Sequence, residues 1–109
     1  YRTNYWRAAG CDLWPPPLDL VTFDAAVNHG VSQAVKWLQR FAGAVPDGVI
    51  GPKTQSAVAV TDPRKAAAYI VERRRALYAK LAARPGQAKF LKGWLARVAD
   101  LEQEAALLG

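Results

Sequence analysis

The sequence predicts an all-α fold: a compact bundle of four to five helices with a Gly/Pro-shaped loop between two short helices and a long C-terminal antiparallel helix pair. Two observations predict this class. Apolar residues recur at spacings of three and four in the longer segments, and glycines and prolines separate those segments. The 109 residues are enough to bury one modest core. Hydrophobic residues make up 51% of the chain and charged residues 22%, which indicates a globular protein and not a disordered one.

The opening segment contains several aromatic residues and is followed by a run of three prolines. Pro15-Pro16-Pro17 is predicted to form an extended connector. After it, Asp19 can cap a helix over residues 20–28, in which Asp24 and Asn28 lie four residues apart on one face. We expect the aromatic side chains of this segment to be exposed, so that they could pair two copies of the chain. These aromatic residues are Tyr1, Tyr5, Trp6 and Trp14.

Residues 31–60 contain the two short helices and the loop between them. An apolar stripe begins at Val31 and continues to Gly43, which is expected to end the helix, while Ser32 is a candidate N-cap. The next ten residues hold two prolines, two glycines and one aspartate, namely Pro46, Asp47-Gly48, Gly51 and Pro52. This density of turn formers is too high for a strand, so we predict a helix, a constrained loop and a second helix.

Within the loop, each residue type has an expected task. Val49 and Ile50 should point inward and fix the loop to the helices. Asp47 is suited to an Asx turn and Thr54 to a bond at the start of the following helix. Gly51-Pro52 should begin that helix, since proline in the first turn loses no hydrogen bond.

Two long helices are predicted to complete the chain. Asp62 and Pro63 begin the first, which runs for about twenty residues until Arg84-Pro85-Gly86 breaks it. The last helix covers residues 87–107. Gly93 inside it costs about 1 kcal/mol relative to alanine, so we expect another helix or a ligand to approach it closely, with Trp94 in a tight crossing. The short connection implies an antiparallel hairpin that covers the central helix-loop-helix.

Positive charge is concentrated in the second half of the chain. The net charge is +6, and ten of the fifteen Lys and Arg residues lie within residues 64–97, where Glu72 is the only acid. Such a cluster attracts polyanions. Arg73-Arg74-Arg75 spans about 200° of a helix, so the three cannot face one ligand. One of them is expected to lie on the packed face and to pair with a carboxylate.

Few residues could carry catalysis or bind a metal. Cys11, the only cysteine, is expected to be a buried structural thiol. His29, the only histidine, is expected to cap a helix end or to be exposed, with a substrate contact as the alternative. The first glutamate is Glu72, which leaves only three aspartates upstream of the loop. We predict no catalytic residue, no metal site and no cofactor, and the apolar runs are too short to span a membrane.

The loop and its flanks resemble a known motif. Leu38-Gln39, the run DGVIGP at residues 47–52, Thr54 and Ala57 are similar to the LQ…DG.IGP.T..A pattern of peptidoglycan-binding helical modules. Further matches extend the resemblance over residues 5–102, to the C-terminal half of glycoside hydrolase family 108, whose members are N-acetylmuramidases of phages and bacteria. These further matches are Phe23-Asp24, Asn28, Gly30, Phe90, Gly93-Trp94 and Arg97-Val98.

The resemblance implies both a domain organisation and a function. Residues 1–31 would be the C-terminal remnant of a lysozyme-like muramidase domain, and residues 32–109 a peptidoglycan-binding helical domain. The chain would anchor the catalytic part of a muramidase or endolysin-like lytic protein on the cell wall. Family members carry a catalytic glutamate in a Glu-Gly-Gly motif, which this sequence lacks. We therefore expect this chain alone to be inactive and its full-length parent to be an N-acetylmuramidase.

The implied location is the cell wall or periplasm, reached by export or phage-mediated release, although the chain itself shows no signal sequence. A basic helical interaction domain, binding nucleic acid or a protein partner, is the alternative from another functional class. Nucleic acid ranks below the wall because the helix after Pro52 is short and turns apolar, unlike a DNA-recognition helix.

Carbohydrate sites pair flat aromatic faces with amide and charged groups, and nine residues of this chain offer that chemistry. The resemblance places Asp24 and Asn28 beside a glycan groove, while a solvated helix face is the alternative. For Trp37 and Trp94, the sequence leaves open whether the ring packs in the core or faces a ligand. The candidate ligand-binding residues are Asp24, Asn28, Trp37, Gln39, Arg40, Asp47, Thr54, Trp94 and Arg97.

Overall fold

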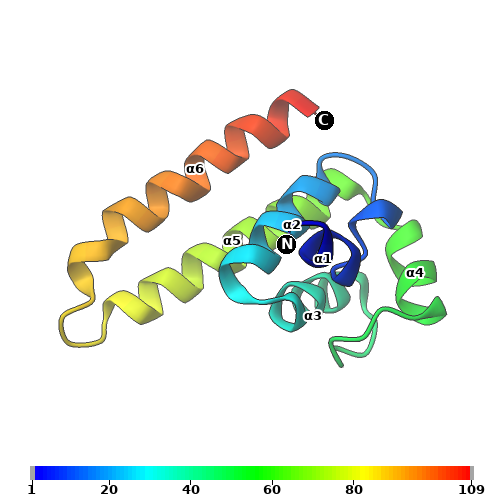
Figure 1. Cartoon of the computed structure of the whole chain (residues 1–109), viewed down its shortest axis with the longest axis horizontal. Helices are drawn as coiled ribbons and strands as arrows, with labels where there is room; N and C mark the ends of the chain where they lie inside the picture. The colour runs from blue at the N-terminus through cyan, green and yellow to red at the C-terminus, as the bar shows by residue number, and fades with distance from the viewer. Residues whose placement is uncertain (1, 109) are drawn as a thin grey trace.

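The computed structural model describes residues 2–108, with side chains for residues 5–107. This part of the chain forms six α-helices and two short 3₁₀ helices, and it contains no β-strand (Figure 1). In chain order these are α1 (Arg2–Ala8), η1 (Cys11–Leu13), α2 (Leu18–His29), α3 (Val31–Ala42), α4 (Pro52–Ala59), α5 (Pro63–Ala82), η2 (Ala88–Phe90) and α6 (Leu91–Leu108). The predicted all-α class is confirmed, with one helix more than expected because residues 2–8 are helical.

The longest helix, α5, organises the bundle. Helices α2 and α3 pack on each other and on α5, and α6 runs back antiparallel along α5 and also contacts α2. Helix α4 packs on α3, and the α5–α6 turn lies at the opposite end of the molecule (Figure 1). The C-terminal antiparallel pair was therefore predicted correctly. The prediction that this pair covers the helix-loop-helix is correct only in part, because α5 packs on α3, the first helix of that unit, while α6 packs on α5 and α2.

Most helix boundaries follow from local chemistry, as predicted. Gly43, in the left-handed region with φ 78°, ends α3, and Gly51 precedes α4, which has Pro52 in its first turn. The Asp62 carboxylate accepts a hydrogen bond of 2.9 Å from the backbone N–H of Arg64, which begins α5. Each of these boundaries needs only two or three adjacent residues, so the sequence is sufficient to place them.

Other boundaries differ from the prediction. Helix α2 begins at Leu18, because the Pro17 carbonyl already accepts the N–H of Val21; Asp19 lies inside the first turn and is not the cap. The Pro16–Pro17 peptide bond is cis. Gly30, with φ 93°, separates α2 from α3, so Ser32 is not an N-cap either. At the other end of the chain, α6 begins at residue 91 after the short helix η2, four residues later than predicted.

One hydrophobic core runs through the whole bundle. Trp14 and Leu18 from the first part of the chain are buried with Leu38, Ile70 and Val98 from the later helices. Residues of the segments 1–31 and 32–109 thus share this core. Shared packing makes the stability of each segment depend on the other.

Three aromatic residues of the opening segment, Tyr5, Trp6 and Trp14, lie in or against this core. Trp14 is 5% exposed, and its indole N–H donates a hydrogen bond of 3.0 Å to the Ala9 carbonyl. Tyr5 and Trp6 are half-buried against the core, and Tyr1 lies outside the described residues. The predicted exposure is therefore wrong for Trp14. Self-association through this segment stays a prediction.

The loop between α3 and α4 is held by one buried amide, that of Gln39. Its Nε2 donates to the Asp47 carboxylate at 2.9 Å, the Val49 carbonyl at 2.8 Å and the Thr54 hydroxyl at 3.0 Å. Its Oε1 accepts the N–H of Gly48 at 2.9 Å. Asp47 also accepts the N–H of Val49, which is the expected Asx turn. These two hydrogen bonds, first that from Val49 and then that from Gln39, lower the pKa of Asp47.

Steric contacts in the loop differ for its two β-branched residues. Ile50 packs against the core, and its Cδ1 approaches Gly10 so closely that a Cβ there would lie 2.5 Å away. Val49 is 65% exposed, so the prediction that it points inward was wrong. Gly48 is required by its φ of 80° and by Ser32, whose hydroxyl would lie 2.7 Å from an added Cβ.

Replacing Gln39 with alanine should destabilise the fold by about 3 kcal/mol, because the loop loses its shared hydrogen-bond partner and a buried volume is emptied. Urea denaturation followed by circular dichroism measures this change. Gln55→Ala, at an exposed position of α4, is the matched control and should change stability by no more than about 0.5 kcal/mol. Equal effects of the two substitutions would show that the loop does not depend on Gln39.

Candidate functional site

A fully buried arginine lies where α2, α5 and the aromatic residues of the bundle meet. Arg74 of α5 has 0% side-chain exposure. Its Nη1 donates to the Asp24 carboxylate, its Nε donates to Nε2 of His29 at 3.1 Å, and its Nη2 donates to the Tyr78 hydroxyl at 3.3 Å. The expectation that one residue of the Arg73–Arg75 run pairs with a carboxylate on the packed face is confirmed. A buried guanidinium is tolerated only with such a set of acceptors.

The ion pair positions Asp24 beside Asn28 on α2. The Asn28 amide donates to both the carbonyl and the carboxylate of Asp24, at 2.8 and 3.3 Å. The Asp24 side chain is 34% exposed, so one side of its carboxylate group faces solvent while Arg74 holds the other. The result is a carboxylate and an amide fixed at a partly open surface.

A row of aromatic rings extends from the core to the surface next to this pair. Trp37, His29, Tyr78, Trp94 and Phe90 follow one another with centroid separations of 5.5, 5.1, 5.1 and 5.7 Å. The two ends of the row differ in exposure, from 2% for Trp37 to 44% for Phe90. Trp94 is half-buried and stacks on Tyr78 at an interplanar angle of 19°. Aromatic surface is therefore accessible at the end that belongs to η2 and α6.

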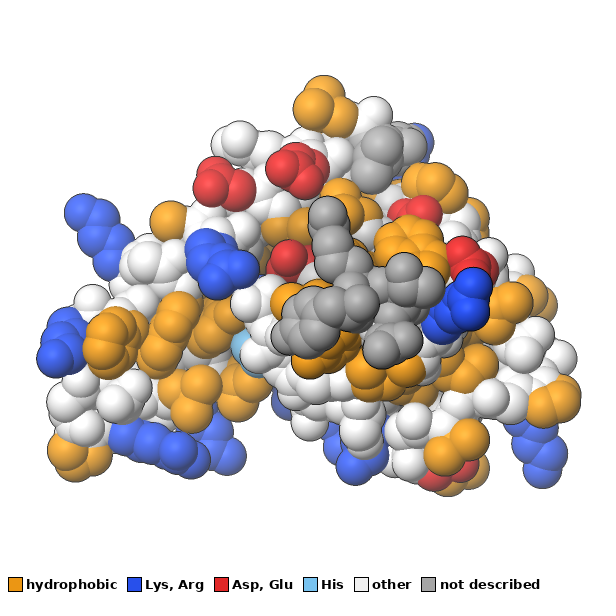
Figure 2. Space-filling view, viewed as in Figure 1, with side chains coloured by type: hydrophobic (Ala, Val, Ile, Leu, Met, Phe, Trp, Pro, Cys, Tyr) orange, Lys and Arg blue, Asp and Glu red, His pale blue; other side chains and the backbone are white. Residues whose placement is uncertain are grey.

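A groove between α2 and α6 begins beside these rings. Asp24, Arg97, Asp100, Leu101 and Glu104 line a hollow of about 170 Å³, which we call the α2–α6 groove. Gly93 precedes Arg97 by one helical turn on the same side of α6, so it continues this surface towards Phe90. Figure 2, viewed as in Figure 1, shows hydrophobic surface at the α5–α6 end and basic and acidic side chains along α6.

Gly93 has no protein neighbour. A Cβ built at this position would meet no atom within 4 Å, and the residue is exposed. The prediction of a tight helix crossing at Gly93 and Trp94 was therefore wrong. The glycine leaves a strip of bare backbone beside a half-exposed tryptophan, which is a surface that a flat ligand can approach.

Electrostatics keep His29 neutral. Burial and, to a smaller extent, the positive charge of Arg74 lower its pKa from the ordinary value of 6.5 to about 4, against an opposing effect of Asp24. The hydrogen bond from Arg74 to Nε2 also requires the neutral ring. We expected His29 to cap a helix end or to be exposed. Instead, the ring packs between Trp37 and Tyr78.

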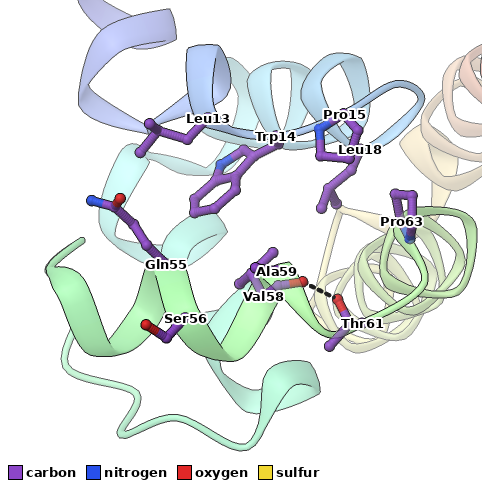
Figure 3. A pocket seen from close by; sticks show the side chains of 10 residues that line it. All are labelled: Leu13, Trp14, Pro15, Leu18, Gln55, Ser56, Val58, Ala59, Thr61 and Pro63. Carbon is purple, nitrogen blue, oxygen red and sulfur yellow. Dashed lines mark hydrogen bonds between the residues drawn. The ribbon is translucent and has the colours of Figure 1, made fainter.

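A larger hollow, with a volume of about 520 Å³, lies elsewhere. Leu13, Trp14 and Pro15 face Gln55 and Ser56 of α4 across it. In Figure 3, Trp14 and Leu18 point from the first part of the chain towards α4. The lining has no charged side chain, and its Trp14 ring is already buried. The sequence analysis did not identify this hollow, because it joins two segments forty residues apart that have no shared motif.

Three further features limit the chemistry of the described residues. Burial, followed by the charges of Asp19 and Asp12, raises the pKa of Cys11 to about 12, so this thiol is inert, as expected for a structural cysteine. No group of three or more His, Cys, Asp and Glu side chains among residues described in the structure could hold a metal ion. Over the same residues, no helix is both long and apolar enough to cross a membrane.

Comparison with known proteins agrees with the motif. Residues 33–99 match the model of the family described as Predicted Peptidoglycan domain. The chain belongs to this family. Residues 1–30 match the model of Glycosyl hydrolase 108, which supports the resemblance to the C-terminal part of a family 108 protein. No curated protein matches the chain.

A solved structure supports the same assignment over almost the whole chain. The structure of Brucella abortus SagA superimposes with a TM-score of 0.84 at 34% sequence identity. The match covers 99% of the present chain and 60% of the SagA chain, so this peptidoglycan-domain protein corresponds to somewhat more than half of that relative.

The structure divides the nine candidate ligand-binding residues of this peptidoglycan domain into three groups. In the first group, Asp24 and Arg97 line the α2–α6 groove. Asn28 bonds Asp24, and Trp94 is linked to Asp24 through Tyr78 and Arg74. Arg40 lines a different groove, between α3 and α5. The remaining four have other tasks: Trp37 is core, and Gln39, Asp47 and Thr54 hold the loop.

The buried members of the last group correct the sequence interpretation. Trp37, Gln39 and Thr54 are 2%, 0% and 5% exposed, so their side chains have almost no surface for a ligand. The reason is that the family motif selects residues that shape the loop. Sequence reasoning, in turn, missed Arg74 and Tyr78, for which the only signal was the expectation that one arginine of three lies inward.

The neutral state of His29 predicts a pH dependence of stability. Because its pKa is lowered on folding, the unfolded chain binds the proton more tightly, so stability is full above about pH 6.5 and falls as the pH decreases towards 4. For this half-buried ring we expect a loss of about 1–2 kcal/mol across that window. Urea denaturation at several pH values should show the loss in the native protein and not in His29→Gln. Parallel pH profiles for the two proteins would contradict this account.

Proposed function

We propose that the chain is the peptidoglycan-binding module of a muramidase-like lytic protein and that the α2–α6 groove is where it binds the glycan. The family assignment supports the ligand class. One chain of contacts supports the place: Asp24, which lines the groove, pairs with Arg74, and Arg74 bonds Tyr78. Half-buried Trp94 stacks on Tyr78 and contacts the exposed ring of Phe90. The flat rings can cover the apolar face of a sugar, while Asp24, Asn28 and Arg97 can satisfy its hydroxyl groups.

The proposal extends to the whole protein. Residues 1–31 would be the C-terminal remnant of the lysozyme-like domain and residues 32–109 the binding domain, and the parent would be an N-acetylmuramidase active at the cell wall or in the periplasm. Binding of the module would keep the catalytic part close to cleavable strands and so raise their effective concentration. The absence of a Glu-Gly-Gly motif from this sequence supports a binding function for this chain and not a catalytic one.

Binding to purified, DNA-free sacculi tests the proposal. We expect the native chain to remain bound in a pull-down as salt increases, because ring stacking and hydrogen bonds to uncharged hydroxyls are little screened. Phe90→Ala should weaken binding by about 3- to 10-fold. Leu95→Ala, which truncates another exposed apolar side chain of α6, is the matched control and should bind like the native chain.

Gly93→Ala separates binding from stability. Alanine should stabilise α6 by about 1 kcal/mol, since no protein atom is in its way, and yet it should weaken sacculus binding because the added methyl group enters the groove. Complete elution at high salt together with equal affinity for duplex DNA would favour the alternative, a basic interaction domain. Equal binding by the Phe90 and Leu95 variants would contradict the proposal that the glycan binds in this groove.

A further inference from the structure

A second groove lies between α3 and α5, and its charge differs from that of the first. Gln33, Trp37 and Arg40 follow one another at helical spacing on α3, and Arg73, Leu77 and Lys80 do so on α5. These two stripes face each other across a hollow of about 220 Å³. Three cations from two helices therefore converge on one concave surface, which we call the α3–α5 groove.

These cations have no carboxylate partner on the helices that carry them. Helix α3 contains no acidic residue, and the only acid of α5, Glu72, pairs with Arg75. Arg75 also pairs with Glu102 of α6, and the Asp24 carboxylate of α2 pairs with Arg74. Within the part of the chain that the structure describes, no ion pair is found for Arg40, Arg73 or Lys80. The positive charge of this groove is uncompensated, while the neighbouring acids are engaged elsewhere.

The size and lining of the groove favour a small anionic group. Two guanidinium groups, one ammonium group and the Gln33 amide are donors suited to the oxygens of a carboxylate or phosphate. The cations lie inside a concavity and the Leu77 side chain lines it as well, so the surface fits the end or side chain of a short peptide better than the regular backbone of a duplex. Peptidoglycan presents such groups as the free carboxylates of its stem peptides.

We propose that the α3–α5 groove binds stem-peptide carboxylates of peptidoglycan. This inference rests on the proposed function and adds a second contact to it. Trp37 lines this groove and is also the inner end of the aromatic row whose outer end is Phe90, and no residue that the structure describes lines both grooves. A glycan strand with branching peptides presents uncharged sugars and charged peptide ends separately, and two grooves of different chemistry match this division.

Two triple variants of equal net charge test the proposal. Arg40→Gln, Arg73→Gln and Lys80→Gln together remove the groove cations. Lys53→Gln, Lys65→Gln and Arg84→Gln together remove three exposed charges outside both grooves. All six residues are exposed, so both variants should fold, which thermal unfolding checks. The ligand is sacculi stripped of phosphate-containing polymers, compared with the same sacculi after their carboxylates have been converted to amides.

The expected result is a loss of affinity for the untreated sacculi of about tenfold or more in the groove variant, and a loss of no more than about twofold in the control variant. The affinity of the native chain for amidated sacculi should fall to that of the groove variant for untreated sacculi. Equal losses of affinity in the two variants, or unchanged binding of the native chain to amidated sacculi, would overturn this proposal. The proposed function would still be supported, because the native chain binds sacculi in both cases.

Three other outcomes would also be decisive. If stripping the phosphate polymers abolishes native binding, the anion is a phosphate and the proposal fails. If the groove variant loses affinity for duplex DNA and not for sacculi, the groove serves nucleic acid and the proposal fails. If the native chain binds no sacculus preparation, the proposed function fails, and with it this inference.

Discussion

The buried guanidinium of Arg74 is the constraint on which the geometry of this protein depends. A charge with no exposure is tolerated only when fixed acceptors surround it, and here they come from α2 as well as from α5 itself. Asp24 and His29 therefore hold α2 in one position relative to α5. Since α6 packs on both, the same contacts fix the α2–α6 groove and the stack of Tyr78 and Trp94 beside it.

The sequence was sufficient at most of the helix ends that adjacent residues decide, although not at Asp19 and Ser32. Asp62-Pro63, Gly43 and Gly51-Pro52 mark helix ends correctly, because capping and backbone conformation act over one turn. The family motif likewise identified the loop. Its most informative residue, Gln39, is buried and saturated with hydrogen bonds, which explains why a motif can identify a domain without marking its ligand site.

The sequence was insufficient wherever the environment comes from distant segments. Arg73, Arg74 and Arg75 have the same intrinsic chemistry, and only the packing of α2 and α6 decides that the second is buried while the others are not. The environment of His29 was misjudged and that of Trp37 was left open for the same reason, since each ring packs against residues of another helix: His29 against Trp37 and Tyr78, and Trp37 against His29. Gly93 shows the converse: the predicted neighbour does not exist, and the space is open.

Two surfaces with different chemistry follow from this arrangement. Three acids, Asp24, Asp100 and Glu104, line one groove together with Arg97, and unpaired cations gather at the other. The net charge of +6 is therefore not spread evenly over the surface. Part of it lies in the α3–α5 groove, whose lining contains no acid among the described residues. A polymer that carries both sugars and carboxylates can use both surfaces, whereas a simple polyanion needs only the second.

A double-mutant cycle on Asp24 and Arg74 tests the central claim most directly. The free energies of unfolding of Asp24→Ala, Arg74→Ala and the double variant are compared with that of the native chain. If this pair joins α2 to α5, the coupling energy should be about 2 kcal/mol or more, because either single change leaves a charge without its partner. Additive effects, with a coupling energy within about 0.5 kcal/mol of zero, would contradict the account.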